Sequence, residues 1–139
     1  MNILKTLDIC SSGLTAQRQR LNVIAENLAN SHTTRTPQGG PYCRKHVVLA
    51  TRPAEEFASC LEDSVKVAVT DIAEDRQGGR PEYDPGHPDA DDKGMVNYPN
   101  VNPVTEMVSL TLASRAFDAN VSVFRAGRAM ALKALEIGR

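Results

Sequence analysis

An acidic turn near the middle of the chain carries the residues best suited to bind a metal ion. Within nine residues it collects Asp84, His87, Asp89, Asp91 and Asp92. Asp89, Asp91 and Gly94 fit part of a calcium-binding loop, whose ligands are oxygen atoms. However, Lys93 stands where that loop needs an oxygen donor, and Asn100 stands where it needs its bidentate glutamate. We interpret the segment as a rigid turn with solvated carboxylates, and we predict no metal site and no cofactor.

No other group of residues has the spacing of a catalytic site. His32, His46 and His87 are far apart in sequence, and no serine or cysteine is placed to act as an activated nucleophile. The TPQGGP glycines lack the Lys–Ser/Thr that completes a phosphate-binding loop. The three cysteines have no metal-binding spacing, and the sequence leaves open whether Cys43 and Cys60 form a disulfide. We therefore predict that the chain is not an enzyme and has no catalytic residues.

Composition argues for a small protein with a thin core. Its 139 residues leave room for about one domain. The chain has no tryptophan, and 41% of its residues are hydrophobic. Its net charge of −1 gives no case for binding nucleic acid. Lys5 and Asp8 interrupt the N-terminal apolar run, so we expect no cleaved signal peptide. No stretch approaches the roughly 18 apolar residues of a membrane span, so we expect no membrane insertion.

The two ends of the chain read as long amphipathic helices. The first is predicted from about Ile3 to Ala29, with Asn30 and Ser31 as stop signals. Its apolar stripe advances in alternating steps of four and three residues, which keeps one helix face continuous. The stripe contains Ile3, Leu7, Cys10, Leu14, Gln17, Leu21, Ile24 and Leu28.

The second helix is predicted to begin at Asn102 and Pro103 and to end near Ile137. Asparagine is a good N-cap, and proline suits the first helical position because its missing N–H is not needed there. The main stripe of this helix contains Met107, Leu110, Ser114, Phe117, Val121, Phe124, Arg128, Ala131 and Leu135. A stripe of small residues, which would let another helix approach closely, runs beside it and contains Ala113, Ala116, Gly127 and Ala134.

The region between the helices is predicted to be small and β-rich. Candidate strands cover residues 42–50, 65–72, 81–83 and 95–98, of which 65–72 shows the clearest alternation. Residues 52–63 fit a mobile loop or a short helix equally well. The predicted fold class is α+β: an N-terminal helical region over 1–36, a β-rich middle over 37–101 and a C-terminal helical region over 102–139.

The helical stripes indicate packing, within one molecule or between molecules. Periodicity alone does not separate these two alternatives. Length favours assembly, because helices of about 40–50 Å greatly exceed the ~13 Å radius of gyration of a compact 100-residue domain. The stripes therefore point to a structural function.

Several sequence strings resemble the bacterial flagellar basal-body rod protein family, and within it the proximal rod proteins. They are RLNVIAENLANSHTTRTPQGGPY, YDPGHPDADDKGMVNYPNVNPVTEMV, ASRAFDANVSVF and ALKALEIGR. Together they cover almost the whole chain. The resemblance implies a structural subunit whose terminal helices pair as a coiled coil and which stacks helically into a hollow drive shaft that transmits torque and leaves an export channel.

The resemblance also implies partners and a location. The expected partners are other copies of the chain, other rod proteins, the membrane-ring and export-gate base with its adaptor, and the type III flagellar export apparatus. The expected location is the basal-body rod crossing the periplasm, reached without a cleaved signal peptide. Neither nucleic acid nor direct membrane insertion is implied.

Certain residues follow from the motifs shared with the family. Asn27 and Asn30 lie in the Asn-Leu-Ala-Asn element, Asn100, Glu106 and Met107 in the Pro-Asn-Val…Glu-Met-Val element, and Arg115 and Asn120 in the third string. These polar groups are expected to fix the register between helices. The expected assembly interface contains Leu7, Leu14, Leu21, Ile24, Asn27, Leu28, Asn30, Met107, Leu110, Arg115, Phe117, Asn120, Val121, Phe124 and Leu135.

Two other functions remain as alternatives. A soluble helical adaptor or export chaperone would share the amphipathic ends but would not need the β-rich middle. A metal-dependent hydrolase would use the aspartates and histidine of the acidic turn, and metal titration would reveal it.

Overall fold

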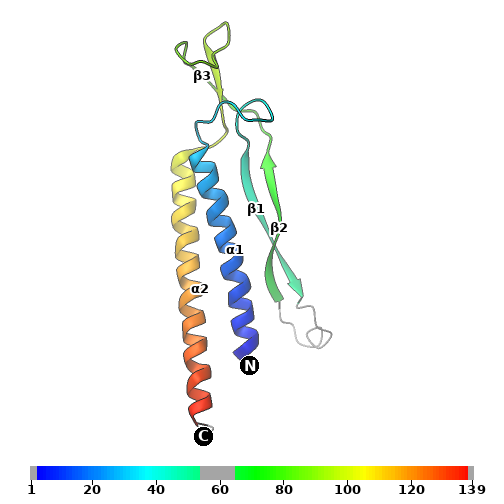
Figure 1. The fold of residues 1–139 in the computed structure, drawn as a ribbon, viewed down its shortest axis with the longest axis vertical. Coiled ribbons are helices and arrows are strands. Elements are labelled where there is room, and N and C mark those ends of the chain that lie inside the picture. The colour runs from blue at the N-terminus through cyan, green and yellow to red at the C-terminus, as the bar shows by residue number, and fades with distance from the viewer. Residues whose placement is uncertain (1–2, 54–64, 138–139) are drawn as a thin grey trace.

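A computed structural model describes residues 3–53 and 65–137. Helix α1 (Ile3–Ala29) is followed by strands β1 (Arg44–Pro53), β2 (Val65–Asp75), β3 (Arg80–Tyr83) and β4 (Met95–Tyr98), and then by helix α2 (Pro103–Ile137). Figure 1 shows α1 and α2 side by side and antiparallel, with the β1–β2 ribbon along α1 and the β3–β4 ribbon beyond the end where α1 stops. The α+β prediction is confirmed.

Both predicted helices have the expected bounds. The Asn102 Oδ1 accepts hydrogen bonds from the backbone N–H groups of Val104, at 3.0 Å, and Thr105, at 3.3 Å. This is the predicted N-cap, and Pro103 is the first residue of the helix. At the end of α1, the Asn30 Nδ2 donates a hydrogen bond to the Glu26 carbonyl at 2.9 Å. The same carbonyl also accepts the Asn30 backbone N–H at 3.0 Å, so the side chain adds a second hydrogen bond at this helix end.

Small residues bring the two helices close together. A Cβ atom at Gly127 would lie 3.3 Å from Leu7, and one at Gly13 would lie 3.4 Å from the side chain of Asn120. Ala113 is also buried. The side of α2 that faces α1 therefore follows positions seven residues apart, namely Glu106, Ala113, Asn120 and Gly127.

The large apolar stripe of α2 is only partly used in this contact. It was predicted to pack against another helix, within one molecule or between molecules, and within the molecule Met107 is 54% exposed and Leu135 is 72% exposed. The contact is shifted toward the small-residue stripe, because small side chains permit the closest approach of two helix backbones. Part of the large apolar stripe is thus left outside the helix pair.

The two β-ribbons are each two-stranded and antiparallel. In the first, Arg44 pairs with Asp75 and Pro53 with Val65, and a register shift occurs between Val48 and Leu49. β1 continues to Pro53, so the first two residues of the 52–63 stretch are strand and not loop or helix. The rest of that stretch, including Cys60 and its possible bridge to Cys43, lies outside the described residues.

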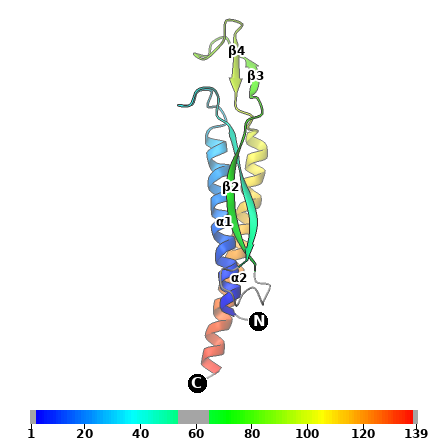
Figure 2. The ribbon, with the colours of Figure 1, turned by 90° about the vertical axis from the view of Figure 1, so that its right-hand side faces the viewer.

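The core is thin and lies where the elements meet. Among the described residues, the buried apolar side chains are Ala16, Val23, Ile24, Tyr42, Val96, Val101 and Ala113. Figure 2 shows that α1 lies against both the β1–β2 ribbon and α2. Within the described residues, no helix has the length and apolarity that a membrane span requires.

The β3–β4 ribbon supplies a test of close backbone packing. A Cβ atom at Gly79 would lie 2.3 Å from the backbone oxygen of Tyr98, whereas one at Gly78 would have no neighbour within 4 Å. We expect Gly79→Ala to lower the free energy of opening of this ribbon by about 1–3 kcal/mol. Gly78→Ala is the matched control and should leave this free energy of opening unchanged or raise it slightly. Amide hydrogen exchange over β3 and β4 measures both, and equal protection in the two variants would contradict the close contact.

Candidate functional site

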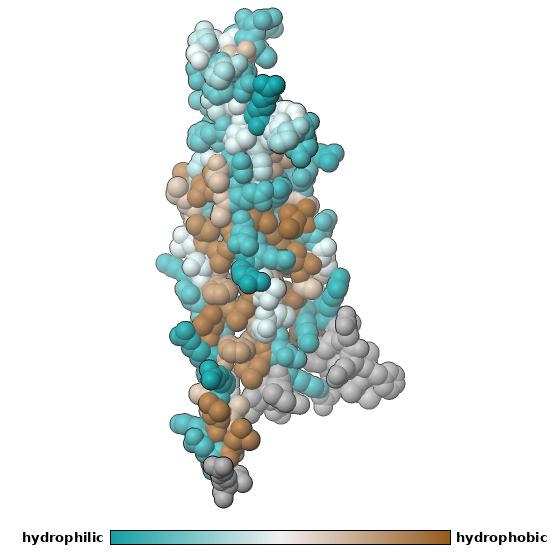
Figure 3. Space-filling view, in the orientation of Figure 1, coloured by the Kyte–Doolittle hydropathy of each residue, from teal (hydrophilic) through white to brown (hydrophobic). Residues whose placement is uncertain are grey.

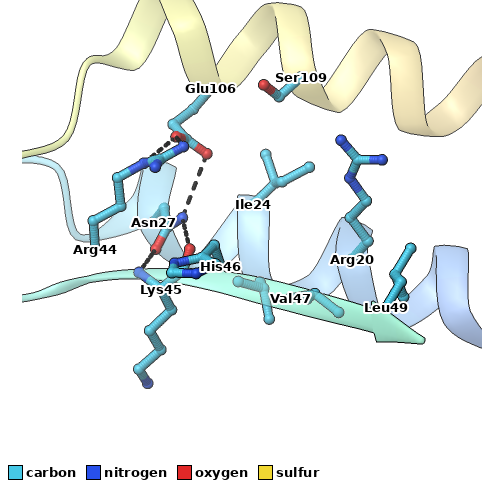
Figure 4. A pocket seen from close by; sticks show the side chains of 11 residues that line it. Arg20, Ile24, Asn27, Arg44, Lys45, His46, Val47, Leu49, Glu106 and Ser109 are labelled. Carbon is cyan, nitrogen blue, oxygen red and sulfur yellow. Dashed lines mark hydrogen bonds and ion pairs between the residues drawn. The ribbon is translucent and has the colours of Figure 1, made fainter. Parts of the chain in front are cut away.

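The most deeply buried polar side chains lie where three chain segments meet. Asn27 comes from the last turns of α1 and Glu106 from the first turn of α2, and each is 1% exposed. Figure 4 shows both beside the start of β1, with the Arg44 side chain reaching Glu106 and the Lys45 backbone lying against Asn27. We call this group, together with Tyr42, the polar lock.

Asn27 uses every hydrogen-bonding position of its amide. Its Nδ2 donates to the Lys45 carbonyl at 2.8 Å and to the Glu106 Oε2 at 3.4 Å. Its Oδ1 accepts from the Lys45 N–H at 2.9 Å and from the Tyr42 hydroxyl at 3.0 Å. A buried amide is stable only when its groups are paired, so this side chain fixes the position of β1 and α2 relative to α1.

Glu106 adds a charged contact to the lock. Its Oε1 accepts from the Arg44 Nε at 2.8 Å and lies 2.8 Å from the Arg44 Nη2. Two guanidinium nitrogens on one carboxylate give geometric specificity as well as attraction. The first turn of a helix also favours a carboxylate, because the helix dipole is positive there. Glu106 thus joins the beginning of α2 to β1 as well as to α1.

Tyr42 and Lys45 close the outer side of the lock. Burial, followed by the charge of Glu26 and of other nearby carboxylates, raises the pKa of Tyr42 to about 12. The phenol is therefore neutral and a hydrogen-bond donor over the physiological range. The Lys45 Nζ lies 2.5 Å from the Glu26 Oε1, so a partly exposed ion pair holds the same strand to the same helix.

A shallow groove of about 290 Å³ lies beside the lock, between the two helices and β1. Val23, Ile24, Val47 and Leu49 provide its apolar walls. In Figure 4, Ile24 and Arg20 point from α1 toward Ser109 on α2. The two charged groups at its end, Glu106 and Arg44, are paired with each other. Such an arrangement positions chain segments and leaves neither group free to act as an acid or a base.

The acidic turn is held by hydrogen bonds within it and by one from the segment that follows α1. The Thr34 hydroxyl donates to the Asp89 Oδ2 at 2.8 Å, and the Asp89 N–H donates to the His87 Nδ1 at 3.1 Å. The Gly86 N–H donates to the Asp84 Oδ1 at 3.2 Å. In the parts of the chain that the structure describes, no three His, Cys, Asp or Glu side chains are grouped to hold a metal ion.

The structure places the predicted interface residues at three levels of exposure. Ile24 and Asn27 are buried. Met107, Arg115 and Leu135 are exposed. The half-buried members are Leu7, Leu14, Leu21, Leu28, Asn30, Leu110, Phe117, Asn120, Val121 and Phe124.

Sequence reasoning found only part of the polar lock. It selected Asn27 and Glu106, but it missed Tyr42, Arg44 and Lys45, of which only Tyr42 lies in one of the shared strings. A weak signal was available, because a buried asparagine and a buried glutamate both need partners and the next strand supplies an arginine and a lysine. The hydrogen bonds of Asn30 run to the Glu26 carbonyl and from the Thr33 hydroxyl, so this residue caps its own helix.

Comparisons with known proteins agree over the whole chain. Residues 7–35 match a family described as flagella basal body rod protein, and residues 92–137 match one described as flagellar basal body rod FlgEFG protein C-terminal. The chain is 45% identical to the flagellar basal-body rod protein FlgC of Escherichia coli O6:H1, over 100% of both chains. It is 40% identical to the FlgC of Bacillus subtilis, also over 100% of both. The FlgC of Borreliella burgdorferi is 40% identical, with 99% of this chain and 98% of the relative covered.

The polar lock predicts a large difference between two asparagines of the same helix. Asn27→Ala would leave the Lys45 backbone and the Tyr42 hydroxyl without their buried partner. We expect the free energy of unfolding to fall by about 1–3 kcal/mol or more. Asn22 is exposed on the same helix, so Asn22→Ala should change the free energy of unfolding by less than about 0.5 kcal/mol. Urea denaturation followed by circular dichroism compares them, and a similar loss in both variants would argue against the lock.

The raised pKa of Tyr42 predicts a loss of stability at high pH. The unfolded chain releases this proton near pH 10, whereas the folded chain keeps it until about pH 12. Between these values the unfolded state binds fewer protons, so the free energy of unfolding falls as pH rises. Below pH 10 the contribution is fully present.

Denaturation curves between pH 8 and pH 12 test this linkage. The difference in the free energy of unfolding between the parent chain and Tyr42→Phe should shrink above pH 10. Tyr83 is 69% exposed, so Tyr83→Phe should keep the pH dependence of the parent chain. A constant difference between the parent chain and Tyr42→Phe would contradict the assignment.

Proposed function

The chain belongs to the flagellar basal-body rod protein family, and we propose that the α1–α2 pair is the part of it that builds the rod. The chain is a structural subunit of the proximal rod, like the FlgC proteins that it matches from end to end, and it is not an enzyme. The acidic turn therefore needs no catalytic role.

The observation that carries the proposal is the contact between α1 and α2. The residues of α2 that face α1 recur every seven positions, and Leu7 and Asn27 of α1 meet two of them, Gly127 and Glu106. A seven-residue repeat is typical of helices that wind around each other as a coiled coil. We infer that the pair is such a coiled coil, and that the polar lock sets its register.

The exposed part of the apolar stripe supports a role in assembly. Leu135 and Met107 are largely exposed, although both lie on the stripe that the helix periodicity predicts to be packed. Figure 3 shows further apolar surface along the helices. Neighbouring subunits would remove this surface from water. That burial stabilises the assembly by about 25 cal/mol for each Å² of apolar area. We propose that the predicted interface residues serve two contacts, one within the helix pair and one between subunits.

The partners follow from the family. We propose that the chain contacts its own copies, other rod proteins and the adaptor at the rod base, and that the type III flagellar export apparatus delivers it without a cleaved signal peptide. In this proposal the rod crosses the periplasm and encloses an export channel. The thin core is consistent with a subunit that completes its burial only after it is assembled.

The proposal predicts that a charge within either stripe prevents assembly. Leu21 and Phe124 are half-buried on α1 and α2, and a carboxylate at either position would be desolvated without a partner. We expect Leu21→Asp and Phe124→Asp to abolish incorporation and motility. Asn22→Asp introduces the same charge at an exposed neighbouring position and should support normal swimming.

Electron microscopy of basal bodies from a strain that lacks this gene is the corresponding structural test. Bodies that stop at the membrane ring, without rod or hook, would support the proposed function when the parent chain restores them. Normal motility in the Leu21→Asp strain and in the Phe124→Asp strain would rule out the proposed interface. Complete basal bodies in the strain without the gene would rule out the proposed function.

A further inference from the structure

Two histidines flank one tyrosine where the β3–β4 ribbon joins the rest of the molecule (Figure 1). The ring centroids of His32, in the segment that follows α1, and of Tyr98, at the end of β4, lie 6.0 Å apart. The ring centroid of His87, in the acidic turn, lies 6.0 Å from that of the same tyrosine. Both histidines meet Tyr98 edge-on, with interplanar angles of 84° and 68°. The acidic turn is therefore connected to the segment that follows α1 through three rings.

The His87 ring also holds the backbone of the turn. Its Nδ1 accepts a hydrogen bond from the Asp89 N–H at 3.1 Å, so this nitrogen carries no proton in the folded turn. The Asp89 Oδ2 in turn accepts a hydrogen bond from the Thr34 hydroxyl at 2.8 Å. The first bond fixes the backbone of Asp89, and the second fixes its side chain on the segment that follows α1. Together they form a relay of hydrogen bonds from the imidazole to Thr34.

Charged and titratable groups surround this relay. Asp84 and Asp89 lie beside His87 on the turn, and the Asp84 carbonyl accepts the His87 N–H at 3.3 Å. His32 faces the ring cluster from the segment that follows α1, and Arg80 on β3 lies opposite the central tyrosine and is ion-paired with a glutamate of its own strand. Nearby carboxylates stabilise a protonated imidazole, whereas an accepted hydrogen bond stabilises the neutral ring. The other charged groups of the turn are Asp91, Asp92 and Lys93.

We propose that this junction is a proton-operated switch, in which proton uptake by His87 detaches the acidic turn from the segment that follows α1. Histidine is the side chain that ordinarily changes its charge between pH 5 and pH 8. A protonated imidazole is a donor at both nitrogens, so Nδ1 can no longer accept from the Asp89 N–H. Two donors then face each other, and the new N–H takes the Asp89 carboxylate as its acceptor and withdraws it from Thr34. The turn thus has two arrangements, and acidity selects between them.

Nuclear magnetic resonance of the purified full-length chain between pH 8 and pH 5.5 tests the switch. We expect the Asp89 amide proton to move upfield as the pH falls, because its hydrogen bond is lost. The Thr34 signals should move with the same midpoint as the signals of the His87 ring. The Lys45 amide is bonded to Asn27 in the polar lock, so its signal should not move and reports that the fold is intact.

His87→Asn separates proton uptake from hydrogen bonding. The asparagine Oδ1 replaces Nδ1 as an acceptor, but an amide takes up no proton in this pH range. In this variant the Asp89 and Thr34 signals should no longer depend on pH. His46→Asn is the matched control, because His46 is exposed on β1 and lines the groove beside the polar lock; it should keep the transition of the parent chain. His32→Asn removes the other histidine of the ring cluster but not the acceptor, and should keep the transition as well.

Any other result overturns the switch. An Asp89 amide signal that stays fixed while the His87 ring changes charge would show that the turn does not respond to the proton, and a ring that stays neutral down to pH 5.5 would exclude proton uptake. A transition that survives in His87→Asn or disappears in His32→Asn would assign the effect to another group. A Lys45 amide that moves together with the Asp89 amide would indicate unfolding of the whole chain. None of these measurements depends on assembly, so their failure leaves the proposed rod function intact.

Discussion

A single buried amide determines how the three main parts of this chain fit together. Asn27 is hydrogen-bonded to the Lys45 backbone, the Tyr42 hydroxyl and the Glu106 carboxylate, so helix α1, strand β1 and helix α2 meet at one point. Inside a protein each of these groups would be costly without its partner, which makes one relative arrangement much better than its neighbours. Arg44 extends the same constraint to the charge on Glu106.

The rest of the helix pair follows from that point. Asn27 and Gly13 are 14 residues apart on α1, and Glu106 and Asn120 are 14 residues apart on α2. Equal spacing on both helices means that the register set at the lock is kept along the contact. The small residues on both sides then allow close approach without requiring large interlocking side chains. This explains why the core is thin and why so much apolar surface remains outside it.

Local patterns predicted the elements well, and tertiary contacts less well. Both helices and the positions of all four described strands follow from periodicity, capping residues and turn residues, which act over a few positions. The polar lock joins residues that are 18, 62 and 79 positions apart, and nothing in their local sequence indicates these distances. Periodicity indicated both an apolar face of α2 and a neighbouring stripe of small residues, but it does not rank them, so it did not indicate which of the two lies closer to α1.

The position of the lock gives the helix pair a mechanical asymmetry. The polar contacts are concentrated at the end where α1 stops and α2 begins, whereas farther along the described contacts involve small and apolar residues such as Gly127 and Leu7. Separating the helices from the end where α1 begins and α2 stops would break these weak contacts one turn at a time. Separating them from the other end would require several buried hydrogen bonds and an ion pair to break together. The pair therefore resists force from one direction more than from the other, and separation begins at the end where α1 starts and α2 stops.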